Sequence, residues 1–199
     1  MNLQDHILLW NKALIEIIDI RQSSFCPGDA KVRYTLPASA YLFVKRGSTS
    51  GLIDGISLTF ESTHVIHGGK GMNIELLLAE EILEYYLVLY RSILALPARK
   101  NLLAIIERSD PFNQQYHFFP GNPLPLLDKL NTMFQEWQKA SPLEQLHVKS
   151  LFYQWVYELL RQLHSQDIQT LKPDPLDLAV HYMQNYYHEP ITLENWPKL

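Results

Sequence analysis

The chain has 199 residues, of which 47% are hydrophobic and 19% charged, and its 17 basic and 21 acidic residues give a formal net charge of −4. This composition is typical of a globular protein, and it is too apolar for intrinsic disorder. No cluster of Lys and Arg provides the basic face that a duplex-binding domain needs, so this segment alone should bind DNA weakly or not at all. The single cysteine, Cys26, excludes an internal disulfide and a CxxC metal site.

No segment predicts secretion or insertion into a membrane. The strongly apolar run from Leu83 to Leu96 contains Glu84 and Arg91, and it is shorter than the roughly 20 residues that a bilayer-spanning helix needs. The first residues lack the basic region and the small-residue cleavage site of a signal peptide. We therefore expect a cytoplasmic protein.

The first part of the chain predicts a short helix and then a series of strands. Apolar residues at helical spacing indicate a leading helix within residues 1–14. From 15 to 121, short β-type runs alternate with turn signals, and the candidate strands are IEIIDI, AKVRYTL, AYLFVKR, TSGLID, GISLTFE, THVIH, MNIELLL, EYYLVLY and QQYHFF. Asp54-Gly55 supplies the positive φ angles of a two-residue hairpin. Many short strands with tight turns predict an antiparallel sandwich or barrel.

The second part predicts helices. Residues 96–112 follow no single period and predict a mixed connection. Apolar residues then follow a helical stripe from about 123 to 139, and Ser141-Pro142 begins another helix, because proline is favourable in a first helical turn. Together they form a helical hairpin over 122–168. A third helix is expected from Leu176 to Tyr187.

The last residues, PDPLDLAVHYMQNYYHEPITLENWPKL, resemble the start of the DNA-binding domain of AraC/XylS-type transcription regulators. The matching residues are Met183, Tyr186-Tyr187 and the run from Pro190 to Glu194. Thr192 is suited to cap the next helix, since its hydroxyl can accept from a backbone N–H. Trp196-Pro197 departs from the family, which usually has Leu-Ala there. YTLPASAYLFVKRGSTSGLIDGISLTF is similar to the cupin-like sensor half of the same family, and HGGKGMNIELLLAEEILEYYLVLYRS resembles a Gram-positive branch whose members can carry a fused solute-binding domain for ferric siderophores.

The resemblance implies an α+β fold, with an N-terminal antiparallel cupin-like β-barrel (a double-stranded β-helix) followed by a helical hairpin and one more helix. It implies the effector-sensing and dimerisation region of a regulator, with residues 174–199 as the first helix and truncated start of a helix-turn-helix domain. Thr192, Leu193 and Glu194 would open that domain, and DNA would be bound only through the missing remainder. The expected partners are a second copy and a small effector, either a sugar or a siderophore-linked molecule. The alternative is a stand-alone cupin-type enzyme, or a protein that binds a sugar or small acid.

The proposed strands are rich in aromatic residues, which either fill a core or line a ligand pocket. The full set is Tyr34, Tyr41, Phe43, Phe60, Tyr85, Tyr86, Tyr90, Tyr116 and Phe118. Two strands, AYLFVKR and EYYLVLY, are apolar at both parities, so one face should line the barrel and the helical hairpin should cover the other. For the pocket, the predicted ligand-binding residues are Arg33, Tyr41, Phe43, His67, Glu75, Tyr86 and Tyr90.

No catalytic residue, metal or cofactor is predicted. A cupin metal site needs two histidines two residues apart on one strand, so that both imidazoles share a face. His64 and His67 are three apart and should face opposite sides of a regular strand, although Glu61 and Glu75 lie nearby in the sequence. We therefore expect these histidines to be hydrogen-bonded or solvated.

The second helix of the hairpin has an unusually wide apolar surface. Such a helix can be intramolecular core, or it can cover the barrel and still contact a second subunit. For the second alternative, the predicted dimerisation residues are Leu151, Trp155, Val156, Leu159, Leu160 and Leu163.

Overall fold

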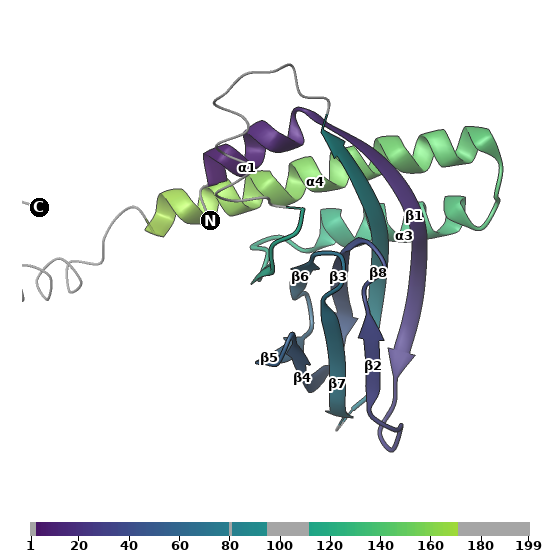
Figure 1. The fold of residues 1–199 in the computed structure, drawn as a ribbon, viewed down its shortest axis with the longest axis vertical. Helices are drawn as coiled ribbons and strands as arrows, with labels where there is room; N and C mark the ends of the chain where they lie inside the picture. The colour runs from purple at the N-terminus through teal and green to yellow at the C-terminus, as the bar shows by residue number, and fades with distance from the viewer. Residues whose placement is uncertain (1–2, 80, 95–111, 171–199) are drawn as a thin grey trace, which may run out of the picture. The chain divides into compact units, whose positions relative to one another are not determined.

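The structure is a computed structural model that describes residues 3–79, 81–94 and 112–170 (Figure 1). The elements are α1 (Leu3–Trp10), β1 (Ala13–Phe25), β2 (Val32–Thr35), β3 (Ser39–Arg46), β4 (Ser48–Ile53), β5 (Ile56–Glu61), β6 (Val65–Gly68), β7 (Asn73–Ala79), β8 (Leu83–Leu94), β9 (Tyr116–Phe118), α3 (Leu124–Trp137) and α4 (Pro142–Thr170). The mixed connection, the third helix and residues 192–194 lie outside the described residues, apart from Phe112 at the end of the connection.

The strands form one long hairpin that is rolled into two facing sheets. Strand β1 pairs with β8, β2 with β7, β3 with β6 and β4 with β5, all antiparallel. Further pairing of β3 with β8 and of β4 with β7 gives sheet orders β1-β8-β3-β6-β9 and β2-β7-β4-β5. This is the jelly-roll order of a double-stranded β-helix, the arrangement found in cupins. The predicted α+β class with a cupin-like barrel is confirmed.

The Asp54-Gly55 turn joins β4 to β5 as predicted. Both residues have positive φ, at 48° and 80°, and Ile53 pairs with Ile56 across the turn. Such a turn matches the right-handed twist of the two strands it joins. It lies at the tip of the rolled hairpin and sets the register of β4 with β5.

The two faces of the five-stranded sheet are both buried. On β3, Ala40, Leu42 and Val44 belong to the core between the sheets, while Tyr41 and Phe43 alternate with them and point the other way. This confirms that AYLFVKR is apolar at both parities because both of its faces are covered.

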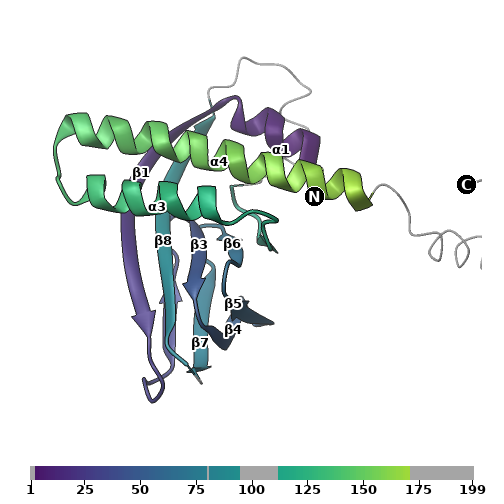
Figure 2. The same ribbon diagram turned by 180° about the vertical axis from the view of Figure 1, so that it is seen from behind.

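Helices α3 and α4 run side by side across the outer face of this sheet, over β1, β8 and β3 (Figure 2). Helix α3 turns Leu126, Leu130 and Met133 into the layer, at the spacing of one helical stripe. The elements up to Gln162 belong to one compact unit, and a second begins at Leu163. No helix among the described residues combines the length and the apolar character needed to span a membrane.

The expected dimerisation residues are mostly used within the monomer. Trp155 and Leu159 are fully buried, and Val156 and Leu160 are nearly so. The Trp155 ring packs edge-on against Tyr41 at 4.9 Å, and its Nε1–H donates to the Leu126 carbonyl at 3.1 Å. Leu151 and Leu163 are half-buried. Trp155, Val156, Leu159 and Leu160 are therefore covered within the monomer, and a dimer contact at Leu151 and Leu163 stays a prediction.

Candidate functional site

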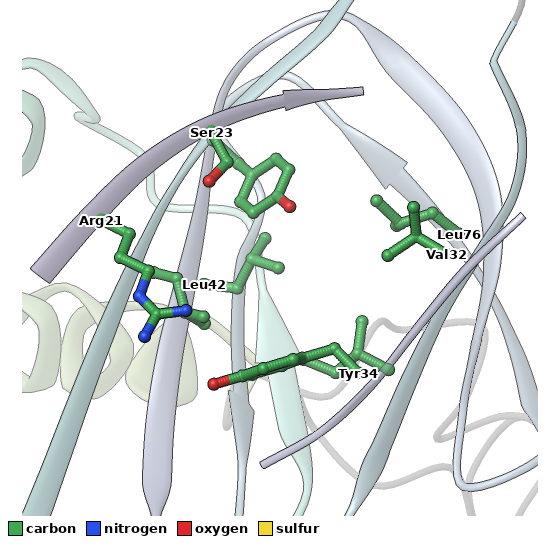
Figure 3. Close-up of a pocket in the computed structure, with 9 residues that line it drawn as sticks. Arg21, Ser23, Val32, Tyr34, Leu42 and Leu76 are labelled. Atoms are coloured by element: carbon green, nitrogen blue, oxygen red, sulfur yellow. The ribbon is translucent and has the colours of Figure 1, made fainter. Parts of the chain in front are cut away.

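A cavity lies between the two sheets and is lined by residues of both (Figure 3). Its volume is about 120 Å³. The lining residues are Arg21, Ser23, Leu42, Tyr85 and Leu87 from the five-stranded sheet, and Val32, Tyr34, Ile74 and Leu76 from the four-stranded sheet. A space between the walls of a small barrel is a position where such folds hold a single small ligand.

Arg21 reaches the cavity because of an irregularity in β1. The register between β1 and β8 shifts between Ile17 and Asp19. Past this bulge, Arg21 and Ser23 face the cavity, and Ile20, which alternates with them, is buried on the opposite side. Because β1 is the edge strand, its side chains form the rim of the cavity.

One end of the cavity is polar. Arg21 Nε–H donates to the Asp19 carboxylate, and this hydrogen bond raises the pKa of the guanidinium. The other oxygen of Asp19 accepts from Trp137 Nε1–H at 3.2 Å, so Asp19 joins the rim to the end of α3. Burial raises the pKa of the Tyr85 hydroxyl, although a hydrogen bond with Ser23 opposes this shift.

The opposite end is aliphatic. Figure 3 shows Val32 and Leu76 across the cavity from Arg21 and Ser23, with the Tyr34 ring along one wall and its hydroxyl directed toward the Arg21 side. The nine lining residues include a guanidinium and three hydroxyls, and none is a His, Cys, Asp or Glu. This arrangement can hold a small amphipathic molecule in one orientation.

The structure places the seven predicted ligand-binding residues on two different sheets. Tyr41, Phe43, His67, Tyr86 and Tyr90 are buried on the outer face of the five-stranded sheet, and Arg33 and Glu75 lie on the other sheet. None of the seven lines the cavity between the sheets. The prediction that they share one pocket is corrected here: their strands alternate, and it is their neighbours that point inward.

The outer-face group includes a chain of hydrogen bonds. His67 Nδ1 lies 2.7 Å from the Gln114 carbonyl and therefore carries the proton, so Nε2 accepts from the Tyr90 hydroxyl at 2.8 Å. The Tyr41 hydroxyl is hydrogen-bonded to Tyr90 and to Tyr116. Each polar tip therefore has a partner, as a buried polar group requires.

Burial sets the protonation states of this chain. It lowers the pKa of His67 to about 3 and raises the pKa of Tyr41 and of Tyr116 above its ordinary value. At neutral pH all three are uncharged. Trp10, Phe152 and Trp155 also pack against Tyr41, so the group is a packed polar core beneath the helices.

The remaining members of the predicted set are on the solvent side of the four-stranded sheet. Glu75 lies 2.6 Å from the Lys31 ammonium and 3.6 Å from Arg33 Nε. The Lys31 hydrogen bond lowers the pKa of Glu75. Since Val32, Tyr34, Ile74 and Leu76 face the cavity, Arg33 and Glu75, which alternate with them, face away from it.

His64 and His67 are both buried, and the side chains of both are hydrogen-bonded. His64 Nε2 lies 3.0 Å from His117 Nδ1, and its Nδ1 lies 3.2 Å from the Thr59 carbonyl. Burial lowers the pKa of His64 to about 4. Among the described residues, no group of three or more His, Cys, Asp and Glu side chains is placed to hold a metal ion.

Sequence reasoning missed most of the cavity. Tyr34 and Tyr85 were among the nine aromatic candidates, but Arg21 and Ser23 were not considered. No clear signal marks them, because Arg21, Gln22 and Ser23 are three polar residues in a row and show no alternation. The bulge before Asp19 reverses the alternation of side chains along β1. The sequence therefore does not show whether odd- or even-numbered residues of this strand point toward the cavity.

No protein-family model and no curated protein matches the sequence. Among solved structures, the EutQ protein of Clostridium difficile is 16% identical, with a TM-score of 0.32 over 40% of this chain and 68% of that one. An RmlC-like cupin with a double-stranded β-helix fold from Methanocaldococcus jannaschii is 12% identical, with a TM-score of 0.33 over 39% of this chain and 78% of that one. A cupin superfamily protein of Desulfitobacterium hafniense is 11% identical, with a TM-score of 0.32 over 41% and 79%. Similarity this weak carries no argument about function, so it is the strand order that identifies the chain as a protein with a cupin-like double-stranded β-helix.

Proposed function

We propose that the chain is the effector-binding region of an AraC/XylS-type transcription regulator, and that the effector binds between the two sheets. The observation that carries this proposal is the cavity with one polar and one aliphatic end at the β1 rim. The order of elements, a cupin-like barrel followed by a helical hairpin, supports it because it is the layout that the resemblance implies. DNA binding would require residues outside those described.

Asp19 offers a route from the effector to the helices. It accepts from Arg21 at the cavity rim and from Trp137 at the end of α3. A ligand that engages Arg21 changes the partners of Asp19, and it would favour one arrangement of α3 over another. An effector needs only such a difference in affinity between two arrangements to shift their populations.

Binding is favoured over catalysis by the chemistry of the lining. The cavity offers a guanidinium, a serine and two tyrosines as polar groups. Burial raises the pKa of Tyr85 further above its ordinary value, which makes it a poor proton acceptor near neutral pH. The alternative of a stand-alone enzyme or a sugar-binding protein has no comparable support from these residues.

The second part of the proposal is a homodimer, which the resemblance implies. Its interface must use residues other than Trp155 and its buried neighbours. The first turns of α4 expose Leu143 and Leu146, at 71% and 65% of their maximal areas. Sedimentation at tens of micromolar checks this part, and a mass of one chain for both the wild type and Leu146→Asp would contradict it.

The test of effector binding is a thermal-unfolding screen of small acids, alcohols, amides and sugars against the purified chain. The matched control is Leu76→Phe, which places a larger side chain in the cavity. We expect at least one class to raise the unfolding temperature of the wild type and not that of Leu76→Phe. If no molecule distinguishes the two proteins, the cavity is not an effector site.

A reporter experiment then separates a regulator from an enzyme. The chain is joined to a heterologous helix-turn-helix module, and transcription from a dyad operator is measured with and without the molecule found in the screen. We expect the molecule to change transcription and to be recovered intact from the protein by NMR. Turnover of the molecule without any change in transcription would favour the enzyme.

A further inference from the structure

We propose that the cavity selects a small aliphatic monocarboxylic acid, and that Arg21 recognises its carboxylate by exchanging Asp19 for the ligand. This inference rests on the proposed function and narrows its effector to one chemical class. It also departs from the sugar or siderophore-linked molecule expected from the sequence. The size, the polarity and the ion pair at the rim of the cavity each support it.

The size of the cavity limits the ligand. Its volume of about 120 Å³ is somewhat smaller than the engineered cavity of ~150 Å³ that takes up benzene. The buried part of the ligand therefore has on the order of six non-hydrogen atoms. A siderophore is far too large for this space, and a free pentose or hexose exceeds it.

The polarity of the walls selects an amphipathic molecule. Leu42, Ile74, Leu76 and Leu87 offer no hydrogen-bonding side chain. A sugar carries hydroxyls on all sides, and those that faced these residues would lose hydrogen bonds to water without replacement, which costs about 1–3 kcal/mol each. A molecule with one polar group and an aliphatic body avoids this cost. The aliphatic body then lies toward Val32 and Leu76 and the polar group toward Arg21 (Figure 3).

The polar group is a carboxylate because of the cation at the rim. Arg21 already binds one carboxylate, that of Asp19, through its Nε–H. A guanidinium has five N–H donors and matches a carboxylate with two parallel hydrogen bonds. Ser23 and Tyr34 supply hydroxyls at the same end of the cavity (Figure 3). A ligand carboxylate placed there meets a charge partner and hydroxyl donors together.

The exchange of partners is feasible because the present ion pair is at the surface. The Arg21 side chain is 53% exposed and that of Asp19 is 26% exposed. Ion pairs of this kind contribute only about 0–1 kcal/mol to stability, so breaking this pair costs little. Asp19 retains the Trp137 indole as a partner during the exchange.

The same contact provides a signal. Trp137 Nε1–H donates to the Asp19 carboxylate, so the removal of Arg21 from Asp19 changes the charge next to this indole. Its fluorescence should therefore report ligand binding, although Trp137 is not among the cavity-lining residues. Trp137→Phe should lose the signal and keep the binding.

The experiment uses 3-methylbutanoate as the acid and 3-methylbutanamide as its neutral counterpart, with affinities measured by calorimetry on four proteins. We expect the wild type to bind the acid and to bind the amide more weakly. Arg21→Gln should weaken acid binding roughly tenfold to a hundredfold, since a hydrogen-bonded charge contributes about 1.5–3 kcal/mol. Asp19→Asn should strengthen it by up to about fivefold, because the competing carboxylate is removed.

The matched control is Arg33→Gln. Arg33 is an arginine of similar exposure, 65%, but it faces away from the cavity and pairs with Glu75. Its substitution should leave acid binding unchanged. Equal effects of Arg21→Gln and Arg33→Gln, or equal affinities for acid and amide, would overturn the carboxylate assignment and leave effector binding intact. Absence of binding by any small molecule would overturn the proposed function as well.

Discussion

The two faces of the five-stranded sheet are built from alternating residues of the same strands, yet they differ in chemistry. On the outer face, aromatic rings and imidazoles lie beneath α1, α3 and α4, and their polar tips are joined in a chain from Gln114 to Tyr116. On the inner face, aliphatic residues meet those of the other sheet, and a cavity remains at the β1 rim.

This difference shows that aromatic content is a poor guide to the position of the cavity in this fold. The outer face has the residues that are expected in a binding pocket, but Tyr41, Tyr86 and Tyr90 are buried there against α3 and α4. The inner face consists largely of aliphatic residues, and the cavity lies there between the two sheets, next to β1. The two faces should therefore respond differently to substitution.

The largest effect is expected for Trp155 on the outer face. Trp155→Ala removes a fully buried ring that contacts Tyr41 and Phe152 and a hydrogen bond to the Leu126 carbonyl. The free energy of unfolding should fall by about 3–5 kcal/mol, measured by urea denaturation. A variant as stable as the wild type, but altered in oligomeric state, would place Trp155 itself in a dimer interface.

The next effect is a loss of stability in acid that depends on His67. Its folded-state pKa is about 3, below the ordinary value of 6.5, so between these values the unfolded chain binds a proton that the folded chain does not. Stability should therefore fall as the pH decreases from 6.5 toward 3, by about 1.4 kcal/mol per pH unit for this residue.

The measurement is the free energy of unfolding at several pH values for the wild type and for His67→Gln. For the variant, the free energy of unfolding should change less steeply with pH over this range, by the equivalent of one bound proton. This should hold whatever the stability of the variant at pH 7. An unchanged slope would show that His67 does not remain neutral in the folded protein.

A pair of enlarged side chains compares the two faces directly. Val88→Phe places a larger group on the outer face, where Val88 is fully buried and lines none of the described cavities, and overpacking should cost about 1–3 kcal/mol. Leu76→Phe extends into the cavity and should change stability by less than about 1 kcal/mol. Equal losses for both variants would show that the cavity cannot accept added volume.

The smallest effect is expected at the solvent side of α4. Tyr157 is 67% exposed, so Tyr157→Ala should change the free energy of unfolding by less than about 0.5 kcal/mol. It serves as the reference for Trp155→Ala, two residues earlier on the same helix. A loss of several kcal/mol would mean that the outer surface of α4 is covered in solution.

Much of the fold could be predicted from the sequence, because it depends on local signals. The Asp54-Gly55 turn, the period-two runs and the switch to helical spacing after Pro123 each predict an element that the structure contains. The covered outer face of β3 was also predictable, since AYLFVKR is apolar at both parities.

The candidate site was harder to predict from the sequence, because it depends on relations between residues that are distant along the chain. Which parity of β3 faces the other sheet is decided by pairing with β6 and β8, and nothing within the strand shows it. The bulge in β1 is likewise invisible in the sequence and reverses the side on which Arg21 emerges. Trp155 looked available for a partner because an amphipathic helix does not reveal whether its apolar side meets its own sheet or a second copy.

The pairing of β1 with β8 also has a consequence for how the chain folds. It places Ala13 beside Leu94 and Phe25 beside Leu83, so β1 must wait during synthesis for β8, which leaves the ribosome later, before the two can pair. Folds dominated by such distant pairings typically form in milliseconds to seconds, far more slowly than helical bundles. During synthesis the edge of β1 is therefore exposed to other nascent chains, and chaperones that shield unpaired strands should raise the yield of native protein.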